Sequence, residues 1–417
     1  MAETRATPTT ARESATWRDV INHSPFWQWA AVASLTRMTP FMTALGFVAA
    51  SIGVFGSDAI GGLMMTAYVL ANLVAPLNGR IHDRFGASRS LPWQLALGAI
   101  AFGMLTVALE RQASSSIVIA SAAGCGLVTA GMSGAMRSTL ADFVGTSMLR
   151  RALAVDAFLL EACVVLAPLV VVLATIRFAW GGVAAMALFT SLAACGAVWL
   201  RGRTPGHPVP VREDRSGDNG NGTKRSLWTN PRFLFWILVS VSFGHVLGTA
   251  ETGALPLART YGMGSLAGAI LIGTLAVLSM AGAFAYASFA DRSGWSEIRQ
   301  ALMFLVVMAI GSAGLAIPDL WLAVLVSMAL IGFCTAPLNI LRQTAVEGLV
   351  PPGRRSEAFA TLFAANGVGF ALAGLSLAAF PLPLMLILGG SSATLSIGYW
   401  QFVVRHATPV AAVEGAN

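Results

Sequence analysis

The chain has 417 residues, of which 56% are hydrophobic and 11% are charged, and its mean hydropathy is +0.72. Because soluble globular domains carry roughly 25% charged residues, this composition excludes an ordinary soluble protein and indicates a polytopic membrane protein. The net charge of +7 does not indicate a nucleic-acid partner, because the basic residues border the apolar runs.

Twelve apolar runs follow one another, each about as long as a helix that crosses a bilayer. The first six are residues 27–51, 58–78, 90–109, 115–138, 152–175 and 179–200, and the second six are residues 232–256, 264–288, 300–317, 320–341, 358–380 and 384–404. The remaining segments are an N-terminal tail (1–26), a polar linker (201–231) and a C-terminal tail (405–417). We therefore predict an all-α membrane protein with an N-terminal six-helix bundle (27–200) and a C-terminal six-helix bundle (232–404).

The basic residues predict the orientation of these spans, because Lys and Arg beside a span stay on the cytoplasmic side. Of 26 basic residues, 20 fall in the two tails, the linker and the loops on their side of the membrane. Only Arg111, Arg177 and Arg259 fall in the opposite loops, and three more lie within or at the edge of the runs. We expect both termini and the linker in the cytoplasm.

The loop between the second and third runs reads GRIHDRFGASR over residues 79–89. Asp83 and Arg84 lie between Gly79 and Gly86, two glycines that we expect to let the backbone turn sharply. A cytoplasmic turn without a further role needs only basic residues, so the aspartate between the glycines singles this loop out.

This spacing resembles the loop motif between helices 2 and 3 of the major facilitator superfamily of secondary transporters. That motif is a glycine, three residues, an aspartate, a basic residue, one residue, a glycine and then basic residues, and the four residues just named match it. The chain departs from it at Ala87 and Ser88, which precede Arg89 where the family usually has basic residues. The resemblance implies two pseudo-symmetric bundles, alternating access and a gate formed by this loop.

The two halves of the chain also repeat each other weakly. Asp291 and Arg292 in SFADRSG correspond to the aspartate and arginine of the loop above. Three charges near the end of the fourth run recur 205 residues later: Arg137 as Arg342, Asp142 as Glu347, and Arg150 as Arg355. Such a repeat is typical of transporters with two parallel halves. The residues expected to form the conformational gate are Gly79, Asp83, Arg84, Gly86, Arg89, Arg137, Asp142, Asp291, Arg292, Arg342, Glu347, Arg354 and Arg355.

Some charges lie deep within the runs. Arg37 is about ten residues into the first span, which places it roughly 15 Å deep, near the membrane midplane. Glu161 has a matching depth in the fifth span, and Asp156 is shallower, nearer the level of Arg137. We expect Arg37 to pair with Glu161 and Arg137 with Asp156, because a buried arginine needs a partner. The deep pair either lines the substrate cavity or fixes helix packing.

The seventh span carries His245 and Glu251, neither of which has a counterpart in the first span. A carboxyl group removed from water binds a proton more readily, so Glu251 is the leading candidate for a proton site. The alternatives are a hydrogen bond at the outer gate or an ion pair with Arg259. For His245 a packing role competes with a role in binding substrate or proton.

These features predict a secondary transporter of a small organic molecule, most simply a proton-coupled exporter of a metabolite or drug. The segments GMSGAMRSTL and VDAFLLEACVVLAP resemble bacterial efflux members of the superfamily, although the glycines usual around the helix-five Gly-Pro of antiporters are absent near Pro168. An uptake permease that binds an organic anion through Arg37 and a non-transporting membrane sensor are the alternatives. We expect no enzyme, because no Ser/His, paired-Asp or HExxH arrangement occurs at one depth.

The expected partners are a small-molecule substrate, protons and the lipid bilayer, with no nucleic acid. The four cysteines lie inside apolar runs without metal-ligand spacing, so we expect neither a metal nor another cofactor. The expected location is the bacterial cytoplasmic (inner) membrane, and the expected state is a monomer.

Overall fold

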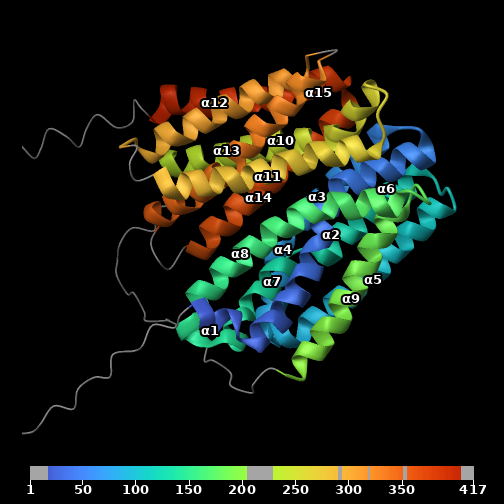
Figure 1. The fold of residues 1–417 in the computed structure, drawn as a ribbon, viewed down its shortest axis with the longest axis vertical. Coiled ribbons are helices and arrows are strands. Elements are labelled where there is room, and N and C mark those ends of the chain that lie inside the picture. Colours follow the sequence, from blue (N-terminus) through green and yellow to red (C-terminus); the bar gives the residue numbers. More distant parts are fainter. Residues whose placement is uncertain (1–16, 204–228, 290–293, 318–319, 351–354, 405–417) are drawn as a thin grey trace, which may run out of the picture.

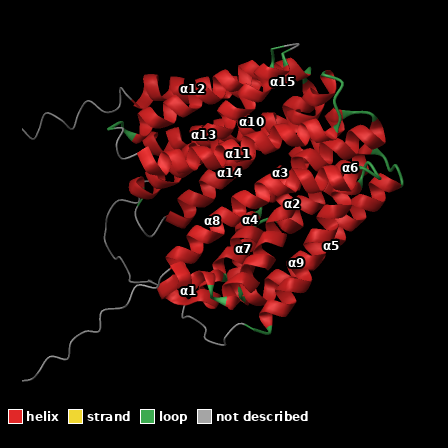
Figure 2. Ribbon diagram, in the orientation of Figure 1, coloured by secondary structure: helices red, strands yellow, loops and turns green. Residues whose placement is uncertain are grey.

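The computed structural model describes residues 17–203, 229–289, 294–317, 320–350 and 355–404, and nearly all of these residues are helical (Figures 1 and 2). No strand occurs in these described ranges. Eleven helices are long and apolar enough to cross a membrane, and a bent pair makes twelve if it is one span. The expected all-α membrane fold is thus confirmed.

The helices fall into two halves of the chain. Those of the first half are α1 (Trp17–Ile21), α2 (Ser24–Phe55), α3 (Asp58–Asn72), α4 (Ala75–Phe85), α5 (Ala87–Glu110), α6 (Ser115–Thr129), α7 (Met132–Ser138), α8 (Leu140–Thr175) and α9 (Gly181–Arg201). Those of the second half are α10 (Pro231–Thr260), α11 (Ser265–Phe289), α12 (Glu297–Leu315), α13 (Trp321–Leu349), α14 (Arg355–Ala379) and α15 (Leu382–Tyr399), which ends in a π-helical turn, η4 (Trp400–Val404).

The packing of these helices forms two bundles with the same internal arrangement. In the first, α2 packs on α8 and α9, α3 on α6, and α5 on α9. In the second, α10 packs on α14 and α15, α11 on α13, and α12 on α15. Figure 1 shows the blue-to-green bundle beside the yellow-to-red one. The two pseudo-symmetric bundles are therefore present as expected.

Small residues allow equivalent helices to approach closely in both bundles. A Cβ at Gly126 of α6 would collide with the backbone of Tyr68 in α3. In the second bundle, a Cβ at Gly332 of α13 would collide with the backbone of Leu275 in α11. Such small-residue contacts are typical of membrane helices, which lack a hydrophobic driving force for association within lipid.

The two ends of the bundles are named here by their connections. The linker end carries Arg201, where α9 ends, and Pro231, where α10 begins. The far end carries Gly56 and Gly262, the glycines with positive φ that follow α2 and lie between α10 and α11. Arg203 donates a hydrogen bond to Gln28 Oε1 (3.2 Å), which shows that α2 also begins at the linker end.

Two spans of the first bundle are broken where a continuous helix was expected. The second bends by 44° between α3 and α4. The fourth is divided into α6 and α7 at Ala130 and Gly131, whose φ of 79° is one that glycine adopts without strain. The membrane-spanning part of the fifth span begins at Arg151, close to the expected start, but its helix α8 already begins at Leu140 and turns at Gly145 (φ 67°).

The loop expected over residues 79–89 is much shorter in the structure. Gly86, with φ 81°, makes the turn as expected, but Gly79 lies inside α4 and makes none. Leu77, Ile81 and Phe85 recur every four residues and are all exposed, so they form one apolar stripe along α4. The sequence 75–85 is therefore an amphipathic helix, and the expectation for Gly79 was wrong.

The bundles contact each other mainly through α3 and α14, with further contacts of α8 on α11 and α2 on α10. A Cβ at Gly62 or at Gly374 would collide with the carbonyl oxygen of the other residue. Thr66 Oγ1 donates a hydrogen bond to the carbonyl oxygen of Ala371 (3.0 Å). This close contact lies on the far-end side of the 44° bend, whereas α4 beyond the bend packs on α5 and α7 of its own bundle.

Candidate functional site

Arg37 and Asp156 form a bidentate ion pair between α2 and α8. Arg37 Nη1 lies 2.5 Å from Asp156 Oδ1, and Nη2 lies 2.9 Å from Oδ2. Both residues are buried, with 3% and 1% of their surfaces exposed. The guanidinium also lies over the Trp29 ring at 5.8 Å from its centroid. Such a planar, two-point contact is the strongest form of arginine–carboxylate pairing.

This pair corrects the expected partner of Arg37, which was Glu161. Asp156 lies eleven residues beyond the turn at Gly145, or roughly 16 Å, and Arg37 lies thirteen residues beyond the start of α2, or roughly 20 Å. A helical side chain also points back toward the N-terminus of its helix, which lowers the guanidinium to the level of Asp156. The side chain of Glu161 lies outside the described residues.

Arg137 on α7 is the second cation near Asp156, as expected. Its Nε lies 3.7 Å from Asp156 Oδ2, and its side chain is 52% exposed. One buried carboxylate thus faces two arginines, one sealed and one open to solvent. The burial of both Arg37 and Asp156 favours the alternative in which this pair fixes helix packing, because neither side chain faces a cavity among the described residues in this conformation.

Arg342 occupies the equivalent place in the second bundle but has different partners. Its Nε and Nη2 donate to Asn339 Oδ1 (3.0 and 2.8 Å), and Nη1 approaches Asn366 Oδ1 (3.4 Å). The guanidinium stacks on the Phe243 ring, 4.5 Å from its centroid, and only 4% of the residue is exposed. Within the described part of the chain no carboxylate pairs with it; the side chain of Glu347 lies outside that part.

This arrangement leaves a buried positive charge held by neutral groups where α10, α13 and α14 meet. Asn339 and Asn366 were not singled out from the sequence. Their signal was present, since two amides within apolar runs at the level of a buried arginine are costly unless they bind something. A cation held this way can still accept an anionic or acceptor group from a ligand.

His245 of α10 lies close to this cluster and is 7% exposed. Its Nε2 lies 3.5 Å from Ser376 Oγ on α14, at the limit of a hydrogen bond. Its Nδ1 is buried and has no hydrogen-bond partner among the described atoms. An unsatisfied buried nitrogen carries a free-energy penalty of about 1–3 kcal/mol, which a ligand can relieve.

Glu251 lies two thirds of the way along α10 toward the far end and is half-buried. The structure shows no ion pair between Glu251 and Arg259 among the residues that it describes, so this alternative receives no support. Its role as a proton site stays a prediction.

The remaining gate residues are only partly visible. Arg84 and Arg89 are exposed at the linker end, and Asp142 on α8 is half-buried. Burial raises the pKa of Asp142 above its ordinary value of 3.8. Asp291, Arg292 and Arg354 lie outside the described residues, as do the side chains of Asp83 and Arg355, so the expected gate stays a prediction.

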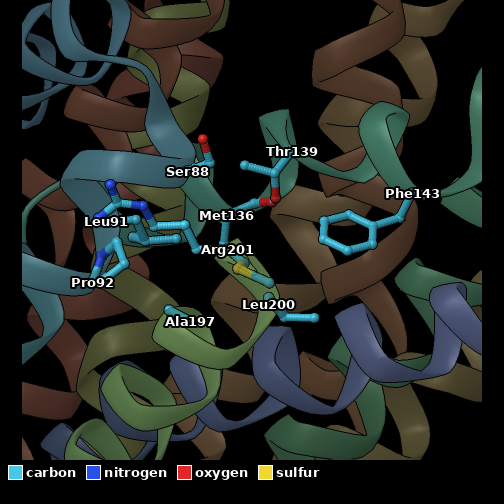
Figure 3. Close-up of a pocket in the computed structure, with 9 residues that line it drawn as sticks. All are labelled: Ser88, Leu91, Pro92, Met136, Thr139, Phe143, Ala197, Leu200 and Arg201. Carbon is cyan, nitrogen blue, oxygen red and sulfur yellow. The ribbon is translucent and has the colours of Figure 1, made fainter. Parts of the chain in front are cut away.

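A small hollow near the linker end lies among α5, α7, α8 and α9. Figure 3 shows Leu91 and Pro92 on one side of it and Phe143 on the other, with Met136 and Thr139 between them. Its volume of ≈ 20 Å³ has room for about one water molecule. It is too small to hold a substrate.

Comparison with solved structures places this arrangement among known transporters. The chain superposes on the POT family transporter PepTSo with a TM-score of 0.73 over 93% of this chain and 99% of that one, at 11% identity. The corresponding values for the nucleoside transporter NupG are 0.68, 91%, 98% and 14%, and for a bacterial metal transporter 0.66, 92%, 99% and 13%. At such identities the likeness shows the fold alone.

Sequence comparison goes further than the fold. No curated protein sequence matches the chain. The sequence profile of the Major Facilitator Superfamily, however, matches residues 29–374, which include the loop motif, most of both bundles and all of the buried charges described above. With most of the chain matched and the twelve-span arrangement present, the protein belongs to the Major Facilitator Superfamily and is a membrane transporter rather than an enzyme.

Proposed function

We propose that the protein is a secondary active transporter that exports a small organic molecule, a metabolite or drug, in a proton-coupled, alternating-access cycle. It works as a monomer in the cytoplasmic membrane of a bacterium, with the linker end in the cytoplasm. The distribution of basic residues supports this orientation. The resemblance of residues 131–140 and 155–168 to efflux members supports the direction.

The observation that carries the proposal is that, among the described residues, buried charges are neutralised by ion pairs in the first bundle but not in the second. In the first, Arg37 and Asp156 neutralise each other and are sealed. In the second, Arg342 is held by amides and an aromatic ring, and Glu251 has no charged partner among the described residues. Ionisable groups within membrane spans are costly unless they serve binding or proton transfer, so the second bundle supplies the site.

The contact between the bundles fits one state of such a cycle. The α3–α14 contact at Gly62 and Gly374 closes the far end. With the linker end in the cytoplasm, this is an inward-facing state, in which the site in the second bundle exchanges with the cytoplasm. The loop at Gly86 and the expected gate residues close the linker end in the opposite state.

The test begins with the ligand. Purified full-length protein is screened against metabolites and drugs for compounds that raise its melting temperature, since a ligand of the folded state stabilises it. The compounds found are then loaded into proteoliposomes, and flux is measured with and without a pH gradient. Glu251→Gln is expected to abolish gradient-driven flux while retaining binding. Glu110→Gln, at an exposed position at the end of α5, is the matched control.

The outcome that contradicts proton coupling is flux through the wild type that does not respond to the gradient. Unchanged gradient-driven flux in Glu251→Gln would show that another carboxyl group carries the proton. Glu161→Gln and Asp156→Asn are the next variants to measure. Ligands bound equally well by Arg342→Gln and wild type would contradict the placement of the site in the second bundle.

A second candidate is uptake of an organic anion, which the amide-held guanidinium of Arg342 favours. Arg37, the residue first expected in this role, is already saturated by Asp156. Whole cells that accumulate a labelled carboxylate, and lose this ability in Arg342→Gln but not in Arg232→Gln at the exposed start of α10, would favour uptake. Accumulation that rises when the protein is deleted would favour export.

A further inference from the structure

A larger hollow lies at the linker end on the outer side of the first bundle, between α4, α5, α6 and α9. Its volume is ≈ 760 Å³, which is enough for the polar headgroup of a lipid and the first part of an acyl chain. It is separate from the buried cluster around Arg342, which lies in the other bundle. Neither the transport cycle nor the gate expected from the sequence accounts for it.

The hollow is lined by positive charge from three different helices. Arg84 comes from α4, Arg89 from α5 and Arg201 from α9, and all three are exposed. No acidic residue is among those that line the hollow in the described part of the chain. Guanidinium groups that line one hollow attract an anion, and phosphate matches the arginine fork well.

The floor of the hollow is a rigid polar network. His82, which is 6% exposed, places Nδ1 2.6 Å from Ser90 Oγ and Nε2 2.7 Å from Gln94 Oε1. Gln94 Nε2 donates to the carbonyl oxygen of Ala130 (2.8 Å), and Asn78 Nδ2 donates to the same oxygen (3.0 Å). These bonds satisfy the backbone carbonyl oxygen at the break between α6 and α7, so the floor of the hollow is ordered without a ligand.

The rim of the hollow is apolar and faces outward. Trp93 is 71% exposed and Leu97 is 56% exposed. They follow Arg89 at spacings of four and eight residues, so the three side chains form one stripe along α5, with the cation at the linker end. On a membrane-spanning helix such exposed apolar groups contact lipid, and tryptophan favours the interface beside the headgroups.

We propose that this hollow binds an anionic phospholipid from the leaflet at the linker end. The phosphate sits among Arg84, Arg89 and Arg201, and an acyl chain lies along Trp93 and Leu97. A soluble phosphate would use the arginines but leave the apolar stripe unused, and a zwitterionic lipid would bring its own cation against them. Basic pockets between membrane helices at this level suit anionic headgroups.

The bound lipid also contacts three different elements of the first bundle. It contacts α4 beyond the 44° bend, α5 after the turn at Gly86 and the end of α9. The same lipid therefore stabilises the first bundle at the end where the expected gate residues lie.

The test measures the melting temperature of the purified full-length protein in detergent. Phosphatidylglycerol, phosphatidylcholine and inorganic phosphate are titrated separately at equal phosphate concentrations, because a ligand of the folded state raises the melting temperature with concentration. Phosphatidylglycerol is expected to give a rise of several degrees, clearly above the other two. Arg89→Gln and Trp93→Ala are each expected to at least halve that rise. Arg111→Gln, exposed just beyond the opposite end of α5, is expected to leave it unchanged.

Three results would overturn the proposal. Equal rises with phosphatidylglycerol and phosphatidylcholine would remove charge recognition, and an equal rise with inorganic phosphate would make this a free-anion site. A rise that both variants retain would place the lipid elsewhere. Bromine-labelled phosphatidylglycerol gives a check that does not depend on stability: quenching of tryptophan fluorescence should fall in Trp93→Phe, and undiminished quenching contradicts the assignment.

Discussion

Replacing Asp156 by asparagine removes the only negative charge that the described structure places against Arg37. The guanidinium would stay in a site where 3% of the residue is exposed, with one neutral amide oxygen and an NH2 group in place of a bidentate carboxylate. Breaking a buried ion pair from one side destabilises a protein by about 3–5 kcal/mol, because the remaining charge is left without compensation. We expect Asp156→Asn to lose stability of this order.

Arg137 provides the matched control, since it contacts the same carboxylate from outside. Its contact is longer, at 3.7 Å, and its side chain is 52% exposed. Exposed ion pairs contribute less than about 1 kcal/mol, so Arg137→Gln should change stability little. Both free energies can be measured by reversible unfolding in mixed micelles, and Asp156→Leu, Arg37→Met and the double variant Arg37→Met/Asp156→Leu complete a double-mutant cycle.

The double variant separates the two roles considered for this pair. Replacing a buried ion pair by apolar residues of similar size is often neutral or stabilising, so stability should return toward wild type. If the pair only fixes α2 on α8, transport returns as well; if it serves the transport cycle, the protein is stable but inactive. A loss below about 1 kcal/mol in Asp156→Asn, or one no larger than in Arg137→Gln, would refute the energetic argument.

Three further predictions concern packing and titration. Gly374→Leu should push α14 away from Gly62 and hold the far end open. A cysteine introduced at Ser57 should then react faster with a membrane-impermeant maleimide. Gly103→Leu, whose added Cβ meets open space, should not change this rate. Gly126→Ala should lower stability by about 1–3 kcal/mol through its collision with the Tyr68 backbone, whereas Gly124→Ala should not, and equal melting temperatures would contradict the contact. Because burial raises the pKa of Asp142, the folded protein holds this proton more tightly than the unfolded chain, and its contribution to stability should fall as pH rises from 3.8 through the raised value. Asp142→Asn should remove that part of the pH dependence, and an unchanged stability–pH curve would argue against it.

The number and order of spans could be predicted from the sequence because hydrocarbon thickness alone sets the length of each apolar run. The breaks within spans could not. Gly131 has a positive φ and divides the fourth span, but apolar residues flank it on both sides. With 43 glycines in the chain, no single glycine signals a break, and Gly79, which was expected to turn, is helical.

The predicted partner of Arg37 was wrong for a related reason. Depth counted from the start of an apolar run ignores helical turns that precede it, and the helix that carries Asp156 begins just after the turn at Gly145, before the run that starts at residue 152. It also ignores the length of the arginine side chain, which spans more than one helical turn. The sequence therefore paired Arg137 with Asp156 correctly but gave Arg37 the partner Glu161 instead of Asp156.

The repeat explains why the second bundle differs from the first at this level. With the offset of 206 that aligns Pro25 with Pro231, Arg37 corresponds to Phe243, the ring on which Arg342 stacks. With the offset of 205 that aligns Arg137 with Arg342, Asp156 corresponds to Thr361, so the second bundle lacks that carboxylate. Both halves thus have the arginine of the fourth span, but only the first half has its two charged neighbours, Arg37 and Asp156.

The same comparison accounts for the burial of Arg342. Gly131 breaks the fourth span and leaves Arg137 on the short helix α7, where its side chain is half exposed. At the offset of 205 the second half has Ala336, α13 continues without interruption, and Arg342 stays within the bundle. The two bundles therefore differ at this level by one glycine and one carboxylate. The first bundle has the neutralised pair of Arg37 and Asp156, and the second has the buried Arg342, which has no counter-charge among the described residues. This difference between two otherwise equivalent halves is what directs the search for substrate contacts to α10, α13 and α14.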